Sequence, residues 1–101
     1  NSVTLPGFAL TYRWAGPLGD LAALLLSTSP DTVQVGPHEQ LAHVQRWVVA
    51  PLDSKGLGTV TVPEVHAAAE GLDINAQVVT SDGKHVTGLS AVQSTTVLSL
   101  P

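Results

Sequence analysis

The heptapeptide FALTYRW, at positions 8–14, is the stretch that decides the fold class. Large side chains occupy its even positions and small or polar ones its odd positions: Phe8, Leu10, Tyr12 and Trp14 against Ala9, Thr11 and Arg13. A period of two residues is that of a β-strand, in which successive side chains point to opposite faces. The stretch therefore predicts a strand with one buried face.

Further segments of strand character lie on both sides of this one, separated by glycines and prolines. They are residues 21–26, 32–35, 43–49, 58–62, 73–80 and 94–100. Residues 21–26 are a continuous apolar run that could form a buried strand or a short helix, and the nearby Pro17, Gly19 and Pro30 favour the strand. Asp82-Gly83 predicts a hairpin turn, because this dipeptide tolerates positive φ.

Residues 64–70 depart from this pattern. Their sequence, EVHAAAE, has high helix propensity, follows Pro63 and is closed by Gly71, so we expect a short helical turn there. Seven or eight short strands at intervals of about ten residues predict an antiparallel β-sandwich, of immunoglobulin-like, fibronectin-like or jelly-roll-like type. We expect one domain spanning residues 1–101.

The charge composition excludes several classes of function. Charged residues make up 12% of the 101 residues and the net charge is −4, whereas soluble domains average about 25% charged residues. The basic residues are few and scattered: Arg13, Arg46, Lys55 and Lys84. They provide no electrostatic footprint for phosphates or anionic lipid, and the longest apolar run is too short to span a bilayer. Nucleic acid and membrane insertion are therefore not expected.

No cluster of residues indicates catalysis or metal binding. The spacing of His38 and His43 fits neither a helical nor a strand ligand pair, and His66 and His85 are remote in sequence. Acidic residues are spread almost singly over the loops, there is no cysteine, and no serine lies in a nucleophile-elbow motif. We expect a protein without metal, cofactor or enzymatic activity.

The aromatic residues raise the separate hypothesis of carbohydrate binding, because sugar rings stack on exposed aromatic side chains. The candidates are Trp47, Trp14 and Tyr12. Tyr12 and Trp14 share their strand face with Leu10, which favours a place in the core. Trp14 is also near a Gly-Pro loop and Trp47 has polar neighbours, so partial exposure of either tryptophan stays open. An exposed Trp47 would favour this hypothesis.

Several short motifs of the chain occur in an order that resembles a known kind of module. They are LPG at 5–7, AALLLS at 22–27, GTVTVP at 58–63, GLDINAQVV at 71–79 and GLSA at 88–91. The chain resembles C-terminal accessory modules of large secreted bacterial proteins, of planctomycete or myxobacteria-like origin, although Ala91 replaces the asparagine often seen there. The resemblance implies an autonomous extracellular β-sandwich without catalytic residues.

Three functions remain open on these observations. The first is a non-catalytic structural or interaction module of an extracellular bacterial protein, acting on other domains, on cell-envelope partners or on a second copy of itself. The second is a carbohydrate-binding module, and the third a subunit of a viral capsid, decoration layer or filament. Because the chain begins at Asn1 without a leader sequence, we expect a processed product or an excised domain.

Overall fold

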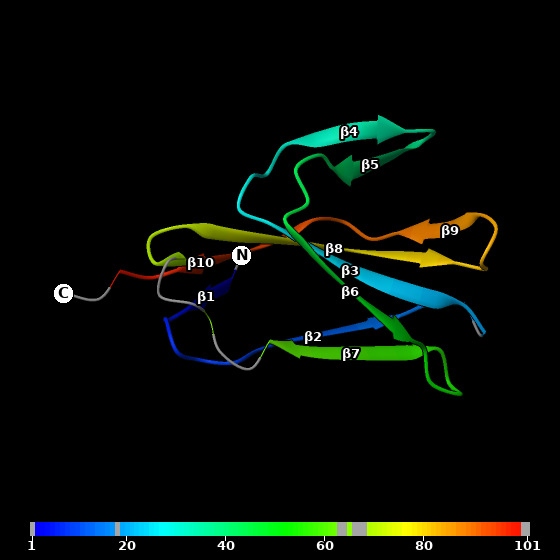
Figure 1. Ribbon diagram of the computed structural model, residues 1–101, viewed down its shortest axis with the longest axis horizontal. Coiled ribbons are helices and arrows are strands. Elements are labelled where there is room, and N and C mark those ends of the chain that lie inside the picture. The colour runs from blue at the N-terminus through cyan, green and yellow to red at the C-terminus, as the bar shows by residue number, and fades with distance from the viewer. Residues whose placement is uncertain (1, 18, 63–64, 66–68, 100–101) are drawn as a thin grey trace.

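The described part of the chain is built from β-strands (Figure 1). The computed structural model describes residues 2–17, 19–62, 65 and 69–99. The strands are β1 (Ser2–Thr4), β2 (Leu10–Ala15), β3 (Leu21–Ser27), β4 (Thr32–Val35), β5 (His38–Leu41), β6 (Arg46–Pro51), β7 (Leu57–Val62), β8 (Asp73–Ser81), β9 (Val86–Leu89) and β10 (Gln93–Val97). The expected all-β class is confirmed.

The largest sheet has six strands in the order β1-β10-β8-β3-β6, with β9 also paired to β8. The nine-residue strand β8 holds it together, because β3 lies on one side of β8 while β10 and β9 share the other. All of these pairs are antiparallel except β1 with β10, which run parallel. The sheet is therefore mixed, and the expectation of antiparallel pairing throughout is wrong at this pair. Parallel neighbouring strands need a long connection. β1 and β10 have one, because they are the first and last strands of the described chain.

Strands β2 and β7 form a separate two-stranded sheet that packs on one face of the large sheet. The shared core contains Leu24 and Leu26 of β3 and Ala76 of β8, against which Tyr12 and Trp14 of β2 pack. The even positions of β2 and β3 thus face each other, as the alternation at residues 8–14 predicts for β2. Phe8 precedes the strand and its side chain is 60% exposed, so it does not extend the buried face.

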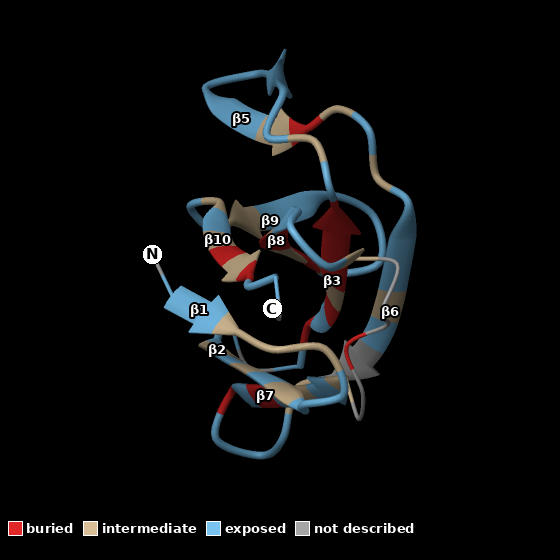
Figure 2. Cartoon of the chain, turned by 90° about the vertical axis from the view of Figure 1, so that its left-hand side faces the viewer, coloured by how far each residue is buried: buried red, intermediate tan, exposed pale blue. Residues whose placement is uncertain are grey.

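Strands β4 and β5 form a hairpin on the opposite face of the large sheet (Figure 2). Val35 pairs with His38, so the turn consists of Gly36 and Pro37. Gly36 has a φ of 58°, which suits the first central position of a type II′ turn. The hairpin is attached through Leu41, which is almost fully buried beside β8.

The described chain has ten strands, more than the seven or eight expected. The additional strands β1, β5 and β9 are three or four residues long and were not expected from the sequence. The expected helical turn at 64–70 falls mainly on residues outside those that the structure describes. At its end, the Leu72 N–H donates to the Ala69 carbonyl over 2.9 Å.

Candidate functional site

Strand β6 lies at the edge of the large sheet and exposes two large apolar side chains. Trp47 is 66% exposed and Val49 is 59% exposed. Both pair with odd positions of β3, Leu25 and Ala23, so they lie on the face opposite the shared core. Within the described residues, β3 is the one strand to which β6 is hydrogen-bonded. The exposed side chains and the outer backbone edge of β6 therefore form one surface, here called the β6 surface.

The structure does not bring the three candidate sugar-binding aromatics together. Tyr12 and Trp14 are half-buried and pack against the shared core between the sheets, whereas Trp47 belongs to the β6 surface. A Cβ atom at Gly58 of β7 would overlap the Trp14 indole, so the ring is seated directly on the β7 backbone. Trp47 is thus the one accessible aromatic of the three.

The Tyr12 hydroxyl and Trp14 Nε1 are buried, although the two residues as a whole are half-buried. Neither the Tyr12 hydroxyl nor Trp14 Nε1 has a hydrogen-bond partner among the residues that the structure describes. Burial raises the pKa of Tyr12, because a phenolate at this position would lose its hydration. The nearby Thr95 side chain lowers the pKa to a lesser extent, although it does not form a regular hydrogen bond with the Tyr12 hydroxyl. Tyr12 is therefore a neutral phenol at neutral pH.

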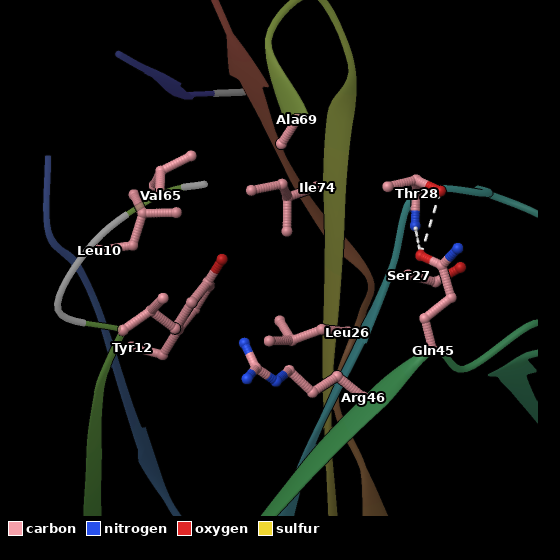
Figure 3. Close-up of a pocket in the computed structure, with 11 residues that line it drawn as sticks. Leu10, Tyr12, Leu26, Ser27, Thr28, Gln45, Arg46, Val65, Ala69 and Ile74 are labelled. Atoms are coloured by element: carbon pink, nitrogen blue, oxygen red, sulfur yellow. Dashed lines mark hydrogen bonds between the residues drawn. The ribbon is translucent and has the colours of Figure 1, made fainter. Parts of the chain in front are cut away.

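A cavity of about 290 Å³ opens at one end of the two packed sheets (Figure 3). It lies where β2, β6 and β8 begin and where β3 and β7 end. Its apolar lining residues are Leu10, Leu26, Val62, Val65, Ala69 and Ile74, together with the Tyr12 ring. Polar residues Ser27, Thr28, Gln45 and Arg46 complete the lining. This end cavity is the most apolar hollow found in the described residues.

A second hollow, of about 610 Å³, lies between the β4–β5 hairpin and the large sheet. Its lining is more polar and includes Asn75, Ser90 and Ser94. These groups are largely satisfied within the protein: Ser94 Oγ donates to Asn75 Oδ1 over 2.6 Å, and Ser90 Oγ accepts from the Val78 N–H over 2.9 Å. The wall formed by the large sheet therefore offers few free polar groups to a ligand, and the other polar lining residues, Thr32, His38 and Glu39, are exposed residues of the hairpin.

The three described histidines, His38, His43 and His85, do not converge on a metal site. His43 lies 3.8 Å from the Asp31 carboxylate and His85 lies 3.9 Å from that of Asp82, both in exposed positions, while His38 begins β5. No group of three or more ligating side chains occurs in residues 2–17, 19–62, 65 and 69–99. His66 falls outside those residues.

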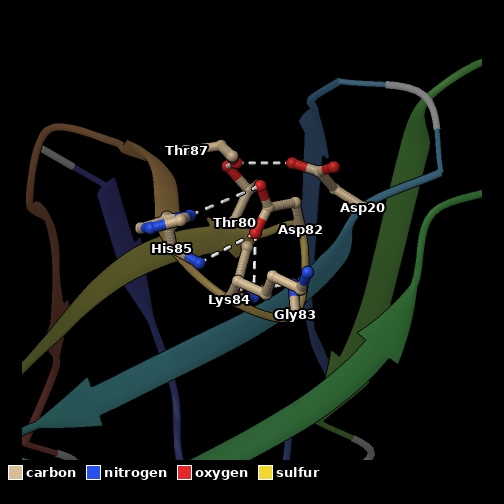
Figure 4. Close-up of polar contacts among 8 residues, drawn as sticks. Asp20, Thr80, Asp82, Gly83, Lys84, His85 and Thr87 are labelled. Atoms are coloured by element: carbon tan, nitrogen blue, oxygen red, sulfur yellow. Dashed lines mark hydrogen bonds and ion pairs between the residues drawn. The ribbon is translucent and has the colours of Figure 1, made fainter.

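A polar cluster near the β8–β9 turn has a structural role (Figure 4). The backbone N–H groups of Lys84 and His85 each donate to Asp82 Oδ1 over 2.8 Å, which closes the turn at Gly83. These bonds, led by that from His85, lower the pKa of Asp82, since they stabilise its carboxylate. The turn predicted from Asp82-Gly83 is confirmed.

A second contact in the same region ties a loop to the sheet. The buried Asp20 accepts a short hydrogen bond from the Thr87 hydroxyl, which also bonds Thr80 over 2.9 Å. Each of these groups is satisfied within the fold, so the cluster offers no reactive residue.

Sequence reasoning missed two residues that the structure singles out. The alternation in residues 43–49 predicts that Arg46 faces away from Trp47 and Val49, but it does not predict that Arg46 lines the end cavity. The alternation in residues 73–80 places Gln77 on the strand face opposite Ile74, Ala76 and Val78 and thus predicts an outward residue, yet Gln77 is 1% exposed and holds the hairpin. Both depend on contacts with strands distant in sequence, for which the chain carries no local signal.

In comparisons of the chain with protein-family models, with curated proteins and with solved structures, nothing matched. Within the described residues, no helix has the length and apolar character needed to cross a membrane.

Proposed function

We propose that the chain is a non-catalytic structural and interaction module of an extracellular bacterial protein, and that it associates through strand addition at β6. We further propose that its two packed layers are a β-sandwich and that its partner is a second copy of the same chain. The resemblance to accessory modules of secreted bacterial proteins supports the extracellular setting. The observation that carries the proposal is the β6 surface, with Trp47 and Val49 exposed on a sheet edge.

An edge strand with an unpaired backbone is a template for another strand, and proteins that remain monomeric usually protect such edges with lysine, proline or bulges. Strand β6 has few of these features. Arg46 at its start is its only charged residue, and Pro51 at its end is its only proline. The four positions between them are uncharged, so the middle of the edge is compatible with pairing.

The sequence of β6 suits pairing with itself. An antiparallel arrangement centred on Val48 and related by a two-fold axis places Trp47 of each copy opposite Val49 of the other, on one face of a continuous sheet. Aromatic side chains opposite β-branched ones contribute roughly 0.2–1 kcal/mol per pair. The two Arg46 residues then lie at opposite ends of the new ladder, so like charges do not face each other. The low overall charge also keeps repulsion between copies small.

The proposal is tested by sedimentation velocity over a concentration series of the whole chain. We expect reversible dimerisation, and we expect Val49→Lys to weaken it by about tenfold or more, because a lysine on the edge strand opposes strand addition. Val33→Lys is the matched control, since Val33 is exposed on β4, away from β6. Amide hydrogen exchange locates the interface: protection of β6 with concentration is expected. A chain that stays monomeric at millimolar concentration, with β6 amides unprotected, contradicts the proposal.

Carbohydrate binding is a second candidate, favoured by the 66% exposure of Trp47. An exposed indole on a sheet face is a stacking platform for a sugar ring. Affinity electrophoresis on a panel of polysaccharides tests it, with Trp47→Ala expected to abolish any retardation and Val33→Lys expected to leave it intact. Absence of retardation on every polysaccharide removes this candidate.

A further inference from the structure

The end cavity combines an apolar interior with a cation at its rim. Leu10 and the Tyr12 ring line it from β2, and Leu26 and Ile74 line it from β3 and β8. Such a lining with few polar groups is typical of sites for small apolar molecules. The cavity lies on the core side of β6, so it is separate from the β6 surface and does not depend on the proposed self-association.

Arg46 is directed to the core side by the register of its strand. It pairs with Leu26, whose side chain belongs to the shared core, and residues directly opposite each other in a ladder point to the same face. Figure 3 shows the Arg46 side chain extending toward the Tyr12 ring across the cavity. Arg46 lines the cavity and is exposed, as is usual for an arginine whose apolar stem covers apolar surface while its charge keeps contact with water.

The Arg46 guanidinium is not neutralised by the described protein. The ion pairs found in residues 2–17, 19–62, 65 and 69–99 both involve histidine, and no hydrogen bond of the Arg46 side chain occurs there. An arginine remains charged at every pH at which proteins fold and presents paired N–H donors that match a carboxylate. An apolar hollow with such a donor at its rim is complementary to an anion that carries an apolar group.

The volume limits the size of that molecule. A water-sized group occupies about 30 Å³, so a cavity of about 290 Å³ holds about ten non-hydrogen atoms. A straight-chain acid of eight carbons has this size. A polysaccharide, or any ligand with many more than about ten non-hydrogen atoms, is too large for this volume.

We propose that the end cavity binds a medium-chain monocarboxylate, with its apolar chain against Leu26 and Ile74 and its carboxylate on the Arg46 guanidinium. The neutral Tyr12 ring forms one wall. Its hydroxyl is sealed off, so it is not required for binding. The site holds the acid without chemical change. The lining hydroxyls of Ser27 and Thr28 bond to the Ser29 N–H and to Gln45, and no histidine or carboxylate lines the cavity among the described residues.

The test is an NMR titration of the isotope-labelled whole chain with octanoate. Octan-1-ol is the analogue without the charge, and acetate is the carboxylate without the long alkyl chain. We expect saturable shifts at the amides of Leu26, Arg46 and Ile74, with a dissociation constant of about 1 mM, which is within the ceiling for a ligand of this size. Acetate is expected to produce no saturable shift. Octan-1-ol is expected to bind about tenfold more weakly than octanoate, because it lacks the charged contact.

Arg46→Gln isolates the role of the guanidinium. It is expected to weaken octanoate binding about tenfold while leaving octan-1-ol unchanged. Arg13→Gln is the matched control, because Arg13 is the other arginine, lies on the outward side of β2 and does not line this cavity. Ala69→Leu is expected to weaken both ligands by filling the cavity.

The proposal would be overturned by the absence of a saturable shift with octanoate, by equal affinity for octanoate and octan-1-ol, or by equal effects of Arg46→Gln and Arg13→Gln. Shifts centred on Trp47 and Val49 would also overturn it, since they would place binding on the β6 surface. The titrations are repeated on the Val49→Lys variant. Octanoate binding in the end cavity is thereby tested separately from self-association through β6.

Discussion

The backbone N–H of Leu41 donates a 2.9 Å hydrogen bond to the side-chain oxygen of Gln77, 36 residues away. The amide nitrogen of Gln77 donates in turn to the carbonyls of Glu39, over 2.7 Å, and Ser90, over 2.9 Å. One buried side chain therefore joins the hairpin and the segment after β9 to the central strand β8. The arrangement of the hairpin over the large sheet depends on this contact.

Replacing Gln77 with leucine is expected to lower the free energy of unfolding by about 3 kcal/mol, because one N–H and two carbonyls lose their partner in a buried site. Urea unfolding measures the loss, and NMR is expected to show the largest changes in β4 and β5. Gln93→Leu, at an exposed position of β10, is the control and is expected to change stability by less than about 0.5 kcal/mol. Equal effects of the two substitutions would contradict the role of Gln77.

Tyr12→Phe is expected to stabilise the protein by about 1 kcal/mol. The hydroxyl is buried without a hydrogen-bond partner in the described part of the chain, so its removal relieves a desolvation cost while the ring keeps its packing. Thermal unfolding measures the gain. Thr11→Val serves as control, because the Thr11 hydroxyl is exposed and bonds that of Thr61 over 3.1 Å, and no gain is expected there. A destabilised Tyr12→Phe variant would show that the hydroxyl has a partner.

Gly58→Ala is expected to destabilise the protein by about 2 kcal/mol, because the added methyl group overlaps the Trp14 indole and the core has to shift. Tryptophan fluorescence should change with it, as Trp14 is displaced from β7. Thr59→Ala, at the adjacent exposed position of the same strand, controls for lost strand propensity. An unchanged emission spectrum together with unchanged stability would contradict the close contact.

The pH dependence of stability should include a contribution from Asp82. Its pKa in the folded protein is lowered below the ordinary value of 3.8 by the N–H groups of His85 and Lys84, so the ionised form is favoured on folding. This contribution is fully present above pH 3.8 and is lost as the pH falls through the folded-state value. Carboxyl NMR titration measures the folded pKa directly, and the stability difference between wild type and Asp82→Asn should shrink below pH 3.8. A folded pKa at or above 3.8 would contradict the prediction.

The positions of the strands could be predicted from the sequence where an alternation of apolar and polar residues, or an apolar run, extends over several residues. The strands expected at 21–26, 32–35, 58–62 and 73–80 agree with β3, β4, β7 and β8 to within one residue at each end. The strand expected at 43–49 instead runs from Arg46 to Pro51, and in the preceding loop the side-chain oxygen of Gln45 accepts from the N–H and the hydroxyl of Thr28. The strand expected at 94–100 ends at Val97, which is buried, so Leu98 lies beyond β10 and is exposed, although a strand that continued to residue 100 would point Leu98 inward.

The sequence by itself determined the all-β class, the turn at Asp82-Gly83 and the scarcity of charge, because local periodicity, turn chemistry and composition need no distant partner. Only the tertiary structure decided what covers each strand face and which strands lie at an edge. It buried Gln77 beneath a hairpin, left Trp47 on an edge and turned Arg46 toward the end cavity. The physical reason is that burial and edge position depend on which strands become neighbours, and those neighbours, such as β3 with β8 and β1 with β10, are far apart in the chain.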